Sequence, residues 1–586
     1  MPKNVMKMLK PHPTLGRNDF DLSHRTVHTA NFGELIPSLC VETVPGDKIK
    51  VRVSDLVRAQ PMVTSPFLRA KQHVDVWFVP YNMMWSRFNE FISDKDEPSS
   101  SALHDRLFVP HADLSDVFSE LSFWHGNNYT SVHGEQHECI PTIVRNLDLL
   151  GIPGTFINEI ITQSETFANC MPDLRFNLWR LAAFNLIWYR EYRQQYYDDG
   201  KLILPNAIQG LSNGASYLFN FDWLQCSSEA TSNLGTQSSQ ILAAMMQPRY
   251  RCWKKDIFTG LMPSTQFGNV SVVDSSISSS YTGLLRADGL ITKDVTTRYV
   301  ASSSGGSPTN ATNIPSSGGT NGDWSTQFDI LSLRKSEAVQ RWRENALRAG
   351  NQIEDNFEAH YGVKPKSHLQ VHPQFVASFD APLNIGDINA QAQTGESING
   401  ILGDVAGKGI MSFDGSSEFT FETTDFGVLM GIYSILPEAE YNATNLDRMN
   451  SLLERQDYFT PEYENLGLEG VAKSVITVNG INNPVMGYAP RYFGYKQKHD
   501  RCTGDFMYFG FGSAGYLNGQ FRPWCSPKYD VDYAFNQLPK SALYVNPHVF
   551  DVNFNVDCNT VNQFMVDFYS NVEAIRHMTV SGMPGY

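Results

Sequence analysis

The amino-acid sequence predicts an all-β protein, rich in turns, that buries much of its surface against neighbouring molecules. Charged residues make up only 18% of its 586 residues, against about 25% in typical soluble domains. Aromatic residues make up 12%, and 43 glycines and 30 prolines supply turns. A hydrophobic content of 41% is enough for a sizeable core and excludes a chain that is disordered throughout. The length allows about four domains, or one large domain with long insertions.

Residues 1–30 are expected to form an extended basic arm, because several prolines near the start exclude a long helix. Four cations precede the first acidic residue, and they are Lys3, Lys7, Lys10 and Arg17. Since lysine and arginine neutralise phosphates, these four are the candidate DNA-facing residues. An arm that is merely disordered, or that only packs, is an equally open interpretation. The net charge of −15 argues against a protein whose whole surface binds nucleic acid.

Alternation of apolar and polar residues predicts strands that bury one face and turn the other toward solvent or a partner molecule. The pattern is clear at 47–54, after a Pro-Gly turn, and at 72–80, which a proline ends. Residues 426–433 are instead apolar enough for a strand that is buried on both faces. Strands are expected at 47–54, 72–80, 418–423, 426–433, 542–545 and 549–556.

Two segments switch to a helical period. A helix is expected at about 173–199, where apolar residues recur at steps of three and four behind Asp173 as N-cap. A second helix is expected at about 332–349, with Gly350 as its stop.

Residues 206–330 are expected to be an insertion that projects from the body. More than half of the positions between 271 and 320 are Ser, Thr, Gly or Asn, and such a segment cannot build a core alone. The insertion would divide the body into a first part at 31–205 and a second part at 331–586. No internal repeat at a fixed period is visible, which disfavours propellers and solenoids.

No motif in the chain specifies catalysis, so we expect no enzyme, no catalytic residue, no cofactor and no metal. The segment Gly403–Gly409 has the wrong spacing for a phosphate loop, and His133–Glu138 has the wrong order for a zinc protease. Residues 511–515 lack the first glycine of a nucleophile elbow. The carboxylate pair Asp551/Asp557 is interpreted as surface acids, and the eight cysteines never show CxxC spacing.

Two short runs mix cations with an aromatic residue. Arg341-Trp342-Arg343 and Trp253-Lys254-Lys255 could stack on single-stranded bases. A buried tryptophan between solvated charges is the more probable interpretation of each.

No stretch is long and apolar enough for a membrane span, and the first ten residues lack the apolar block of a secretion signal. We therefore expect a protein that is made and kept in a cytoplasm, or that leaves it by another route.

Several ordered segments of the sequence resemble one family, the major capsid proteins of the gokushovirus-like Microviridae, which are small single-stranded DNA phages. The segments that carry the resemblance are 17–23, 33–37, 42–47, 58–62, 77–85, 88–92, 361–363, 487–492, 503–506 and 578–586. These segments span nearly the whole chain. Their occurrence together, in the same order as in the family, is more specific evidence for the family than any single segment. Residues 206–330 diverge too far to align.

The resemblance implies an eight-stranded antiparallel jelly roll of the viral capsid type with long, partly helical loop insertions. It also implies self-assembly into a T=1 icosahedral shell around packaged single-stranded DNA, so the expected location is the virion, assembled in the host cytoplasm. A minor basic DNA-binding or pilot protein of the virion would neutralise DNA that this acidic chain cannot. Insertions in such proteins form protrusions, so 206–330 is expected to meet a host cell-surface receptor.

Two other classes remain open at this point. A carbohydrate-active or carbohydrate-binding β-sandwich protein would also show aromatic residues on alternating strands, but it gives no reason for the basic arm. A phage tail or receptor-binding protein fits the Ser/Gly-rich loops but usually contains repeats.

Overall fold

The structure of the protein, a computed structural model, forms two compact units, one drawn from residues 1–265 and 365–586 and the other from 266–364. It describes residues 17–62, 69–85, 88–93, 109–124, 129–130, 136–137, 140–163, 174–194, 196–197, 202–203, 216–217, 242, 245–256, 258–266, 299–300, 309–310, 330–349, 358–362, 372–389, 405–412, 417–439, 441–442, 446–475, 485–503, 543–554, 556–558 and 561–580.

The larger sheet of the first unit contains seven strands among the described residues. Its centre is the antiparallel pair β4 (Lys48–Ala59) and β23 (Phe564–Arg576), which join residues far apart in the chain. The other strands are β1 (Asn18–Asp21) and β2 (His24–Ala30) beside β23, β16 (Val405–Met411) and β17 (Glu418–Glu422) beside β4, and β15 (Asn384–Asn389) beside β16. Every pairing in this sheet is antiparallel.

The smaller sheet has four antiparallel strands in the part of the chain that is described. In spatial order they are β14 (Gln374–Pro382), β5 (Ala70–Pro80), β18 (Gly427–Pro437) and β3 (Ile36–Thr43). Every residue of β18 is buried, which confirms the prediction of a doubly buried strand at 426–433.

The two sheets face each other across a shared apolar core. Phe78 of β5 lies 5.0 Å from Phe421 of β17, and Tyr433 of β18 lies 6.3 Å from Phe568 of β23, measured between ring centres. Burial alternates along β4 and β23, so that one face of the larger sheet lines this core and the other faces outward. Mostly antiparallel sheet with added helices is therefore the architecture, in agreement with the predicted all-β class.

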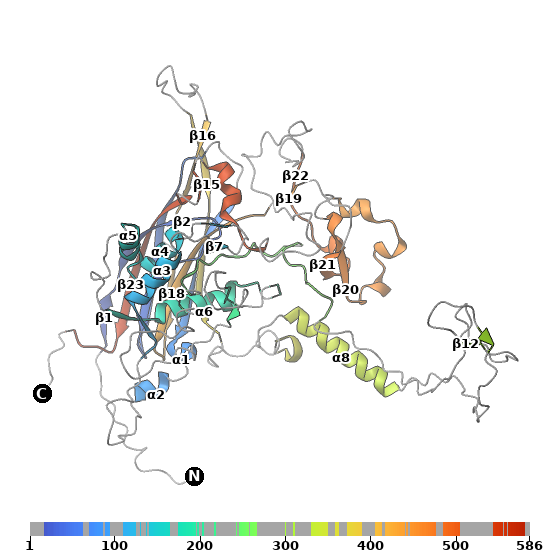
Figure 1. Ribbon diagram of the computed structural model, residues 1–586, viewed down its shortest axis with the longest axis horizontal. Helices are drawn as coiled ribbons and strands as arrows, with labels where there is room; N and C mark the ends of the chain where they lie inside the picture. Colours follow the sequence, from blue (N-terminus) through green and yellow to red (C-terminus); the bar gives the residue numbers. More distant parts are fainter. Residues whose placement is uncertain are drawn as a thin grey trace, which may run out of the picture. The chain divides into compact units, whose positions relative to one another are not determined.

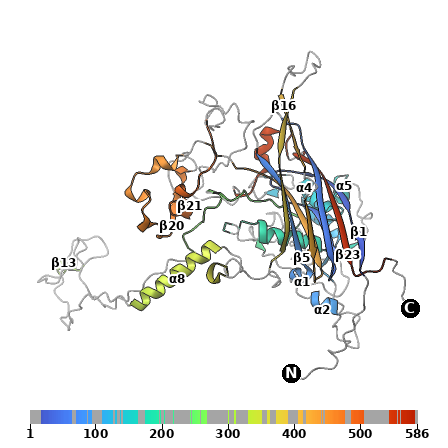
Figure 2. The same ribbon diagram turned by 180° about the vertical axis from the view of Figure 1, so that it is seen from behind.

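A layer of helices covers the other face of the smaller sheet (Figure 1), and Figure 2 shows the strands in front of α4 and α5 from behind. An apolar cluster joins side chains of β5 and β18 to these helices, and Tyr81 stacks on Trp179 at 4.5 Å between ring centres. The helices are α1 (Tyr81–Met84), α2 (Phe88–Ser93), α3 (Leu114–Trp124), α4 (Ile140–Leu149), α5 (Gly154–Thr162) and α6 (Trp179–Ile187), which continues as a π-helical turn, η3 (Trp188–Tyr192). This layer explains why β18 is buried on both faces.

The helix predicted at 173–199 is wrong at both ends, since the helical structure begins at Trp179 and ends at Tyr192 of η3. Residues 175–177 form a strand, β9 (Arg175–Asn177), which pairs with β6 (His111–Asp113), and the helix begins at Trp179. The pairing is reinforced by an ion pair between Arg175 and Asp113 at 3.3 Å. Backbone groups of this segment find partners in a distant strand, and a helical period in the sequence cannot reveal that.

The strand predicted at 549–556 is also wrong, because residues 547–553 form a 3-10 helix, η12 (Pro547–Asn553). Asn546 caps it by accepting a hydrogen bond from the backbone N–H of His548, and Pro547 occupies its first turn. At 542–545, where another strand was predicted, Tyr544 forms a single bridge to Cys252.

The second unit contains the long helix α8 (Ile330–Ala349), which confirms the helix predicted at 332–349. β12 (Tyr299–Val300) pairs antiparallel with β13 (Thr309–Asn310). Within this unit, Trp342 stacks on His360 at 5.6 Å between ring centres. Most of the insertion expected at 206–330 lies outside the described residues, and its limits stay a prediction.

Short elements of the first unit complete the described chain. They are β7 (Tyr129–Thr130) with β8 (Gln136–His137), β10 (Leu202–Ile203) with β11 (Ser216–Tyr217), β19 (Tyr441–Asn442) with β22 (Arg501–Cys502), β20 (Leu468–Ala472) with β21 (Val485–Pro490), α10 (Phe493–Lys496), and the 3-10 turns η6 (Arg448–Ser451), η7 (Arg455–Asp457), η8 (Pro461–Tyr463) and η9 (Lys473–Val475). Among the residues described, no helix combines the length and the apolar character that crossing a bilayer requires.

Candidate functional site

The described part of the basic arm is anchored where the first described residues of the chain contact residues 577 and 578. Lys3, Lys7 and Lys10 lie outside the described residues, and Arg17 is the first described residue. The Arg17 Nε donates to His577 Nε2 at 3.0 Å, and the Asn18 side chain donates to the Met578 carbonyl at 2.5 Å. Pairing of β1 with β23 therefore holds the base of the arm beside the end of the larger sheet.

A ladder of charges lies next to this anchor on the outward face of the larger sheet. Lys48, Lys50 and Arg52 alternate along β4, and each pairs with a glutamate of β17. The ion pairs are Lys48–Glu422 at 2.9 Å, Lys50–Glu418 at 3.1 Å and Arg52–Glu418 at 2.8 Å. Hydrogen bonds from Arg52 and Lys50 lower the pKa of Glu418, and those from Lys48 lower the pKa of Glu422. Since these groups are exposed, the ladder sets the local charge pattern more than it adds stability.

Exposed apolar side chains continue the same outward face across three neighbouring strands. Val27 of β2 and Leu56 of β4 lie on either side of Asp567 in β23. Met565 and Tyr569 are two residues before and two residues after Asp567, on the same face of β23. Val27 is 65% exposed, and the other three apolar residues are exposed as well. We call these four residues, Val27, Leu56, Met565 and Tyr569, the outer apolar patch. Such a patch on a sheet face is typical of a surface that another protein covers.

A cavity of about 1140 Å³ opens beside β2, β3, α4 and α5. Its lining includes His24, His28, Arg145 and Arg180. Burial lowers the pKa of His28 to about 4, so this histidine is neutral at neutral pH. Burial also lowers the pKa of Arg145 to about 10, which leaves its guanidinium charged at neutral pH.

The two runs that combine tryptophan with cations differ in the structure. Trp253 is 7% exposed and packs 6.3 Å from Phe550 between ring centres, as the structural interpretation expects. Trp342 is 58% exposed on α8, so the buried interpretation is wrong for this residue.

The near-matches to catalytic motifs gain no support from the described residues. Residues 405–409 of the glycine-rich segment lie within strand β16, paired with β15, and not in a turn that could hold a phosphate. Residues 131–135 and 511–515 lie outside the described part of the chain.

The sequence did not reveal that distant segments of the chain meet on the outward face of the larger sheet. His577, Glu418, Glu422 and the outer apolar patch belong to it. Alternation signalled the outward faces of 47–54 and 418–423, but not that these two strands pair with each other. Two facing antiparallel sheets with a layer of helices over one of them define a fold class, the β-sandwich proteins.

Comparison with known families is more specific. A profile of the family described as capsid protein (F protein) matches residues 11–113 and 107–586. The chain belongs to this capsid protein family. The match confirms the resemblance to the capsid proteins of the gokushovirus-like Microviridae.

Individual relatives agree with the family. The capsid protein VP1 of Chlamydia phage 1 is 23% identical over 614 aligned residues, which span 98% of this chain and 96% of the relative. The capsid protein VP1 of Bdellovibrio phage phiMH2K is 21% identical over 514 residues, which span 84% of this chain and 82% of that relative. A capsid protein is a structural component of a virion, and that role applies to this chain.

Some segments behind the sequence resemblance have a structural explanation. Gly33, in the segment 33–37, has a φ of +73°, and a Cβ at this position would lie 2.4 Å from the Cβ of Val545. Glu34, the next residue, is fully buried. These residues hold the sandwich together, so their pattern identifies the fold more directly than it identifies a binding site.

Proposed function

We propose that this chain is the major capsid protein of a small single-stranded DNA phage and that it assembles into a T=1 icosahedral shell around the genome. The observation that carries the proposal is the family match over nearly the whole chain, together with the order of the strands.

The strand order supports a jelly roll with eight main strands. Counted along the chain, these are β2, β3, β4, β5, β14, β17, β18 and β23. The larger sheet then has the order first, eighth, third, sixth, and the smaller sheet has the order fifth, fourth, seventh, second. This is the arrangement that two intertwined Greek keys produce, and β1, β15 and β16 are additions to it.

Assembly of many copies is supported by the low charge content and by the outer apolar patch. Only 18% of the residues are charged, and a low content of charged side chains is typical of the central part of protein–protein interfaces. The exposed side chains of Val27 and Leu56 would lose contact with water in a shell, which favours association.

Packaging of DNA is assigned to the arm. Lys3, Lys7, Lys10 and Arg17 would meet phosphates on the inside of the shell, because they precede the anchored strand β1 and the sequence has no acidic residue before Asp19. Since the whole chain has a net charge of −15, a minor basic protein or polyamines would neutralise much of the genome. The insertion at 206–330 would form the surface protrusion that contacts the host receptor, as its Ser/Gly-rich composition suits an exposed loop.

The experiment that tests the proposal is the isolation of the natural particle, followed by sedimentation and negative-stain microscopy with and without nuclease. We expect closed shells that protect single-stranded DNA from digestion. A monomer or small oligomer from the natural source would contradict the shell, and shells without protected DNA would contradict packaging alone.

A further inference from the structure

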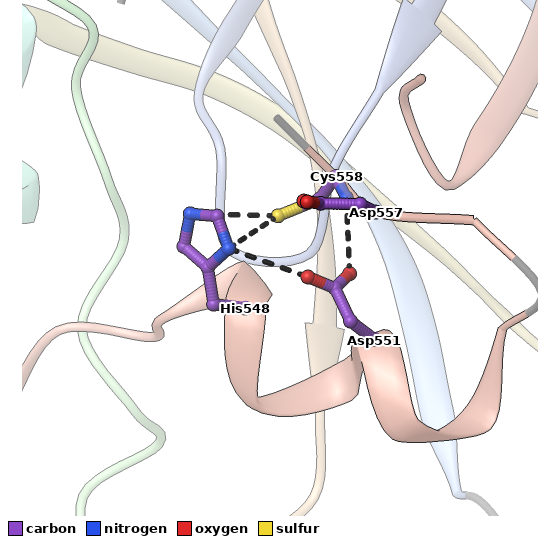
Figure 3. A group of neighbouring side chains, drawn as sticks. All are labelled: His548, Asp551, Asp557 and Cys558. Carbon is purple, nitrogen blue, oxygen red and sulfur yellow. Dashed lines mark hydrogen bonds and ion pairs between the residues drawn. The ribbon is translucent and has the colours of Figure 1, made fainter. Parts of the chain in front are cut away.

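Four side chains with metal-binding atoms converge at one end of the sandwich. They are His548, Asp551, Asp557 and Cys558, and one ligand atom from each lies within 4.8 Å of all the others. Figure 3 shows the imidazole, the thiol and the Asp551 carboxylate pointing toward one another from two segments of the backbone.

The fold brings these residues together through one turn and one reversal. His548 and Asp551 are three residues apart in η12, which is one turn of a 3-10 helix, so they share a face. The chain then folds back, and the backbone N–H of Cys558 donates to Asp551 Oδ1 at 3.2 Å. That hydrogen bond places the Cys558 thiol above the helical turn.

Two distances among the donor atoms are close to those around a small tetrahedral ion. Cys558 Sγ lies 3.0 Å from His548 Nδ1, and Asp551 Oδ2 lies 3.3 Å from the same nitrogen. In tetrahedral zinc sites, bonds of about 2.0–2.3 Å place the donors about 3.3–3.8 Å apart. Small outward movements of the side chains would therefore admit the ion.

The same geometry argues against a catalytic triad. In a cysteine–histidine–aspartate triad, the thiol and the carboxylate bind opposite nitrogens of the imidazole. Here the shorter contact of the thiol, at 3.0 Å, and the contact of Asp551 both fall on Nδ1. Convergence on one point is what metal coordination requires.

A fully buried glutamine orients the aspartate. Gln563 donates through Nε2 to Asp551 Oδ1 at 3.1 Å and to the Pro547 carbonyl at 2.9 Å. With Oδ1 held by Gln563 and by the Cys558 backbone, Oδ2 is turned toward His548. Support of this kind around ligands is typical of metal sites.

We propose that His548, Asp551, Asp557 and Cys558 bind one structural zinc ion. Nitrogen and thiolate ligands select zinc over calcium and magnesium, which prefer oxygen alone. This departs from the expectation of no metal, which rested on the missing CxxC spacing. The ligand spacing is instead His-x2-Asp-x5-Asp-Cys.

The ion would clamp the segment that leads into β23. Phe550 and Phe554 of the same segment pack against Phe32 at 4.3 and 6.2 Å between ring centres. By closing the loop between residues 548 and 558, zinc would hold these rings in the core and raise the thermal stability of the subunit.

The first test is metal binding by the full-length chain, purified and then loaded with zinc or cobalt alone. We expect one zinc per chain, and a cobalt spectrum with a thiolate charge-transfer band and the strong visible bands of a tetrahedral site. In H548A and C558S the affinity for zinc should fall at least about tenfold. The matched control is C252S, which removes another thiol of the first unit and should bind zinc as the wild type does.

Wild-type protein that takes up no more zinc than C558S, or a cobalt spectrum without the thiolate band, would overturn the proposal.

A second measurement uses the wild-type protein alone, so it does not depend on whether a variant folds. The rate at which iodoacetamide alkylates Cys558 in the wild type, read by mass spectrometry, should fall when zinc is added and recover with a chelator. Equal rates with and without zinc would contradict the site, and Cys252 in the same sample is the internal control. Neither test depends on shell assembly, so their failure is separate from failure of the proposed function.

Discussion

Glu34 and Arg145 form an ion pair inside the protein, with the Glu34 side chain 0% exposed and that of Arg145 12% exposed. Glu34 lies between β2 and β3, and Arg145 lies in α4, so the pair ties the helical layer to the sheets. Glu34 Oε2 also accepts a hydrogen bond from the backbone N–H of Asn31 at 3.2 Å. A buried charge is costly without a partner, so each member depends on the other.

Replacing Glu34 should therefore destabilise the subunit strongly. We expect E34Q to lower the free energy of unfolding by about 3–5 kcal/mol, because the Arg145 guanidinium stays buried without its counter-charge. Urea denaturation of the unassembled chain measures this. The control is R25Q, which breaks the exposed pair with Asp567 and should cost less than about 1 kcal/mol. Equal losses for E34Q and R25Q would contradict the role of the buried pair.

Stability should fall in mild acid because of His28. Its ring is buried, contacts Ser38 Oγ at 3.0 Å, and has a pKa lowered from 6.5 to about 4 mainly by burial. Between these pH values the unfolded chain binds a proton at His28 and the folded chain does not. The free energy of unfolding is therefore unaffected by His28 above pH 6.5 and decreases as the pH falls from 6.5 toward 4. The loss is on the order of 3 kcal/mol.

The H28Q variant checks this assignment by urea denaturation across the same pH range. Glutamine keeps a polar side chain but does not titrate, so the stability of H28Q should depend less on pH than that of the wild type. Measurements at pH 7.5 are the control, since they report the cost of the substitution alone. An unchanged pH dependence would assign the acid sensitivity to other groups.

Gly33 should not tolerate a side chain. A Cβ there meets Val545 at 2.4 Å and also has to adopt a φ of +73°. The matched control is Gly467, which has a φ of +101° but no atom within 4 Å of an added Cβ. Thermal unfolding should show G467A destabilised by about 1 kcal/mol from backbone strain, and G33A by about 1–3 kcal/mol more from the clash. Equal effects would mean that the contact with Val545 relaxes freely.

A charge in the outer apolar patch should block assembly without unfolding the subunit. Leu56 is an exposed member of the patch, so L56E should change the stability of the subunit by less than about 0.5 kcal/mol. Sedimentation should show loss of shells in L56E and normal shells in L56M, which keeps an apolar side chain. Normal shells in L56E would place the interface between copies elsewhere.

The basic arm should control how much DNA is packaged. Replacing Lys3, Lys7, Lys10 and Arg17 by alanine removes the contacts with phosphates that we propose, so purified particles should hold less DNA. The variant K3R/K7R/K10R keeps the charge and should package normally. DNA content that is unchanged in the alanine variant would exclude this role of the arm.

Local patterns in the sequence were sufficient for much of the fold. Alternation at 47–54 and 72–80 and the apolar run at 426–433 predicted strands that β4, β5 and β18 occupy. Such patterns are reliable because the period of side chains along one strand or helix depends only on neighbouring residues. The ordered family segments identified a capsid protein from the same kind of information.

The sequence by itself determined the β class, the family, the long helix at about 332–349 and the position of the basic residues, since each depends on residue type and local spacing. Only the tertiary structure decided that Glu34 meets Arg145, that η12 replaces a strand, and that His548 and Cys558 share a site. It also decided that residues 175–177 leave the predicted helix to pair with β6. The reason is physical: burial and contacts between distant segments, summed over the whole core, outweigh the preference of any short segment of chain.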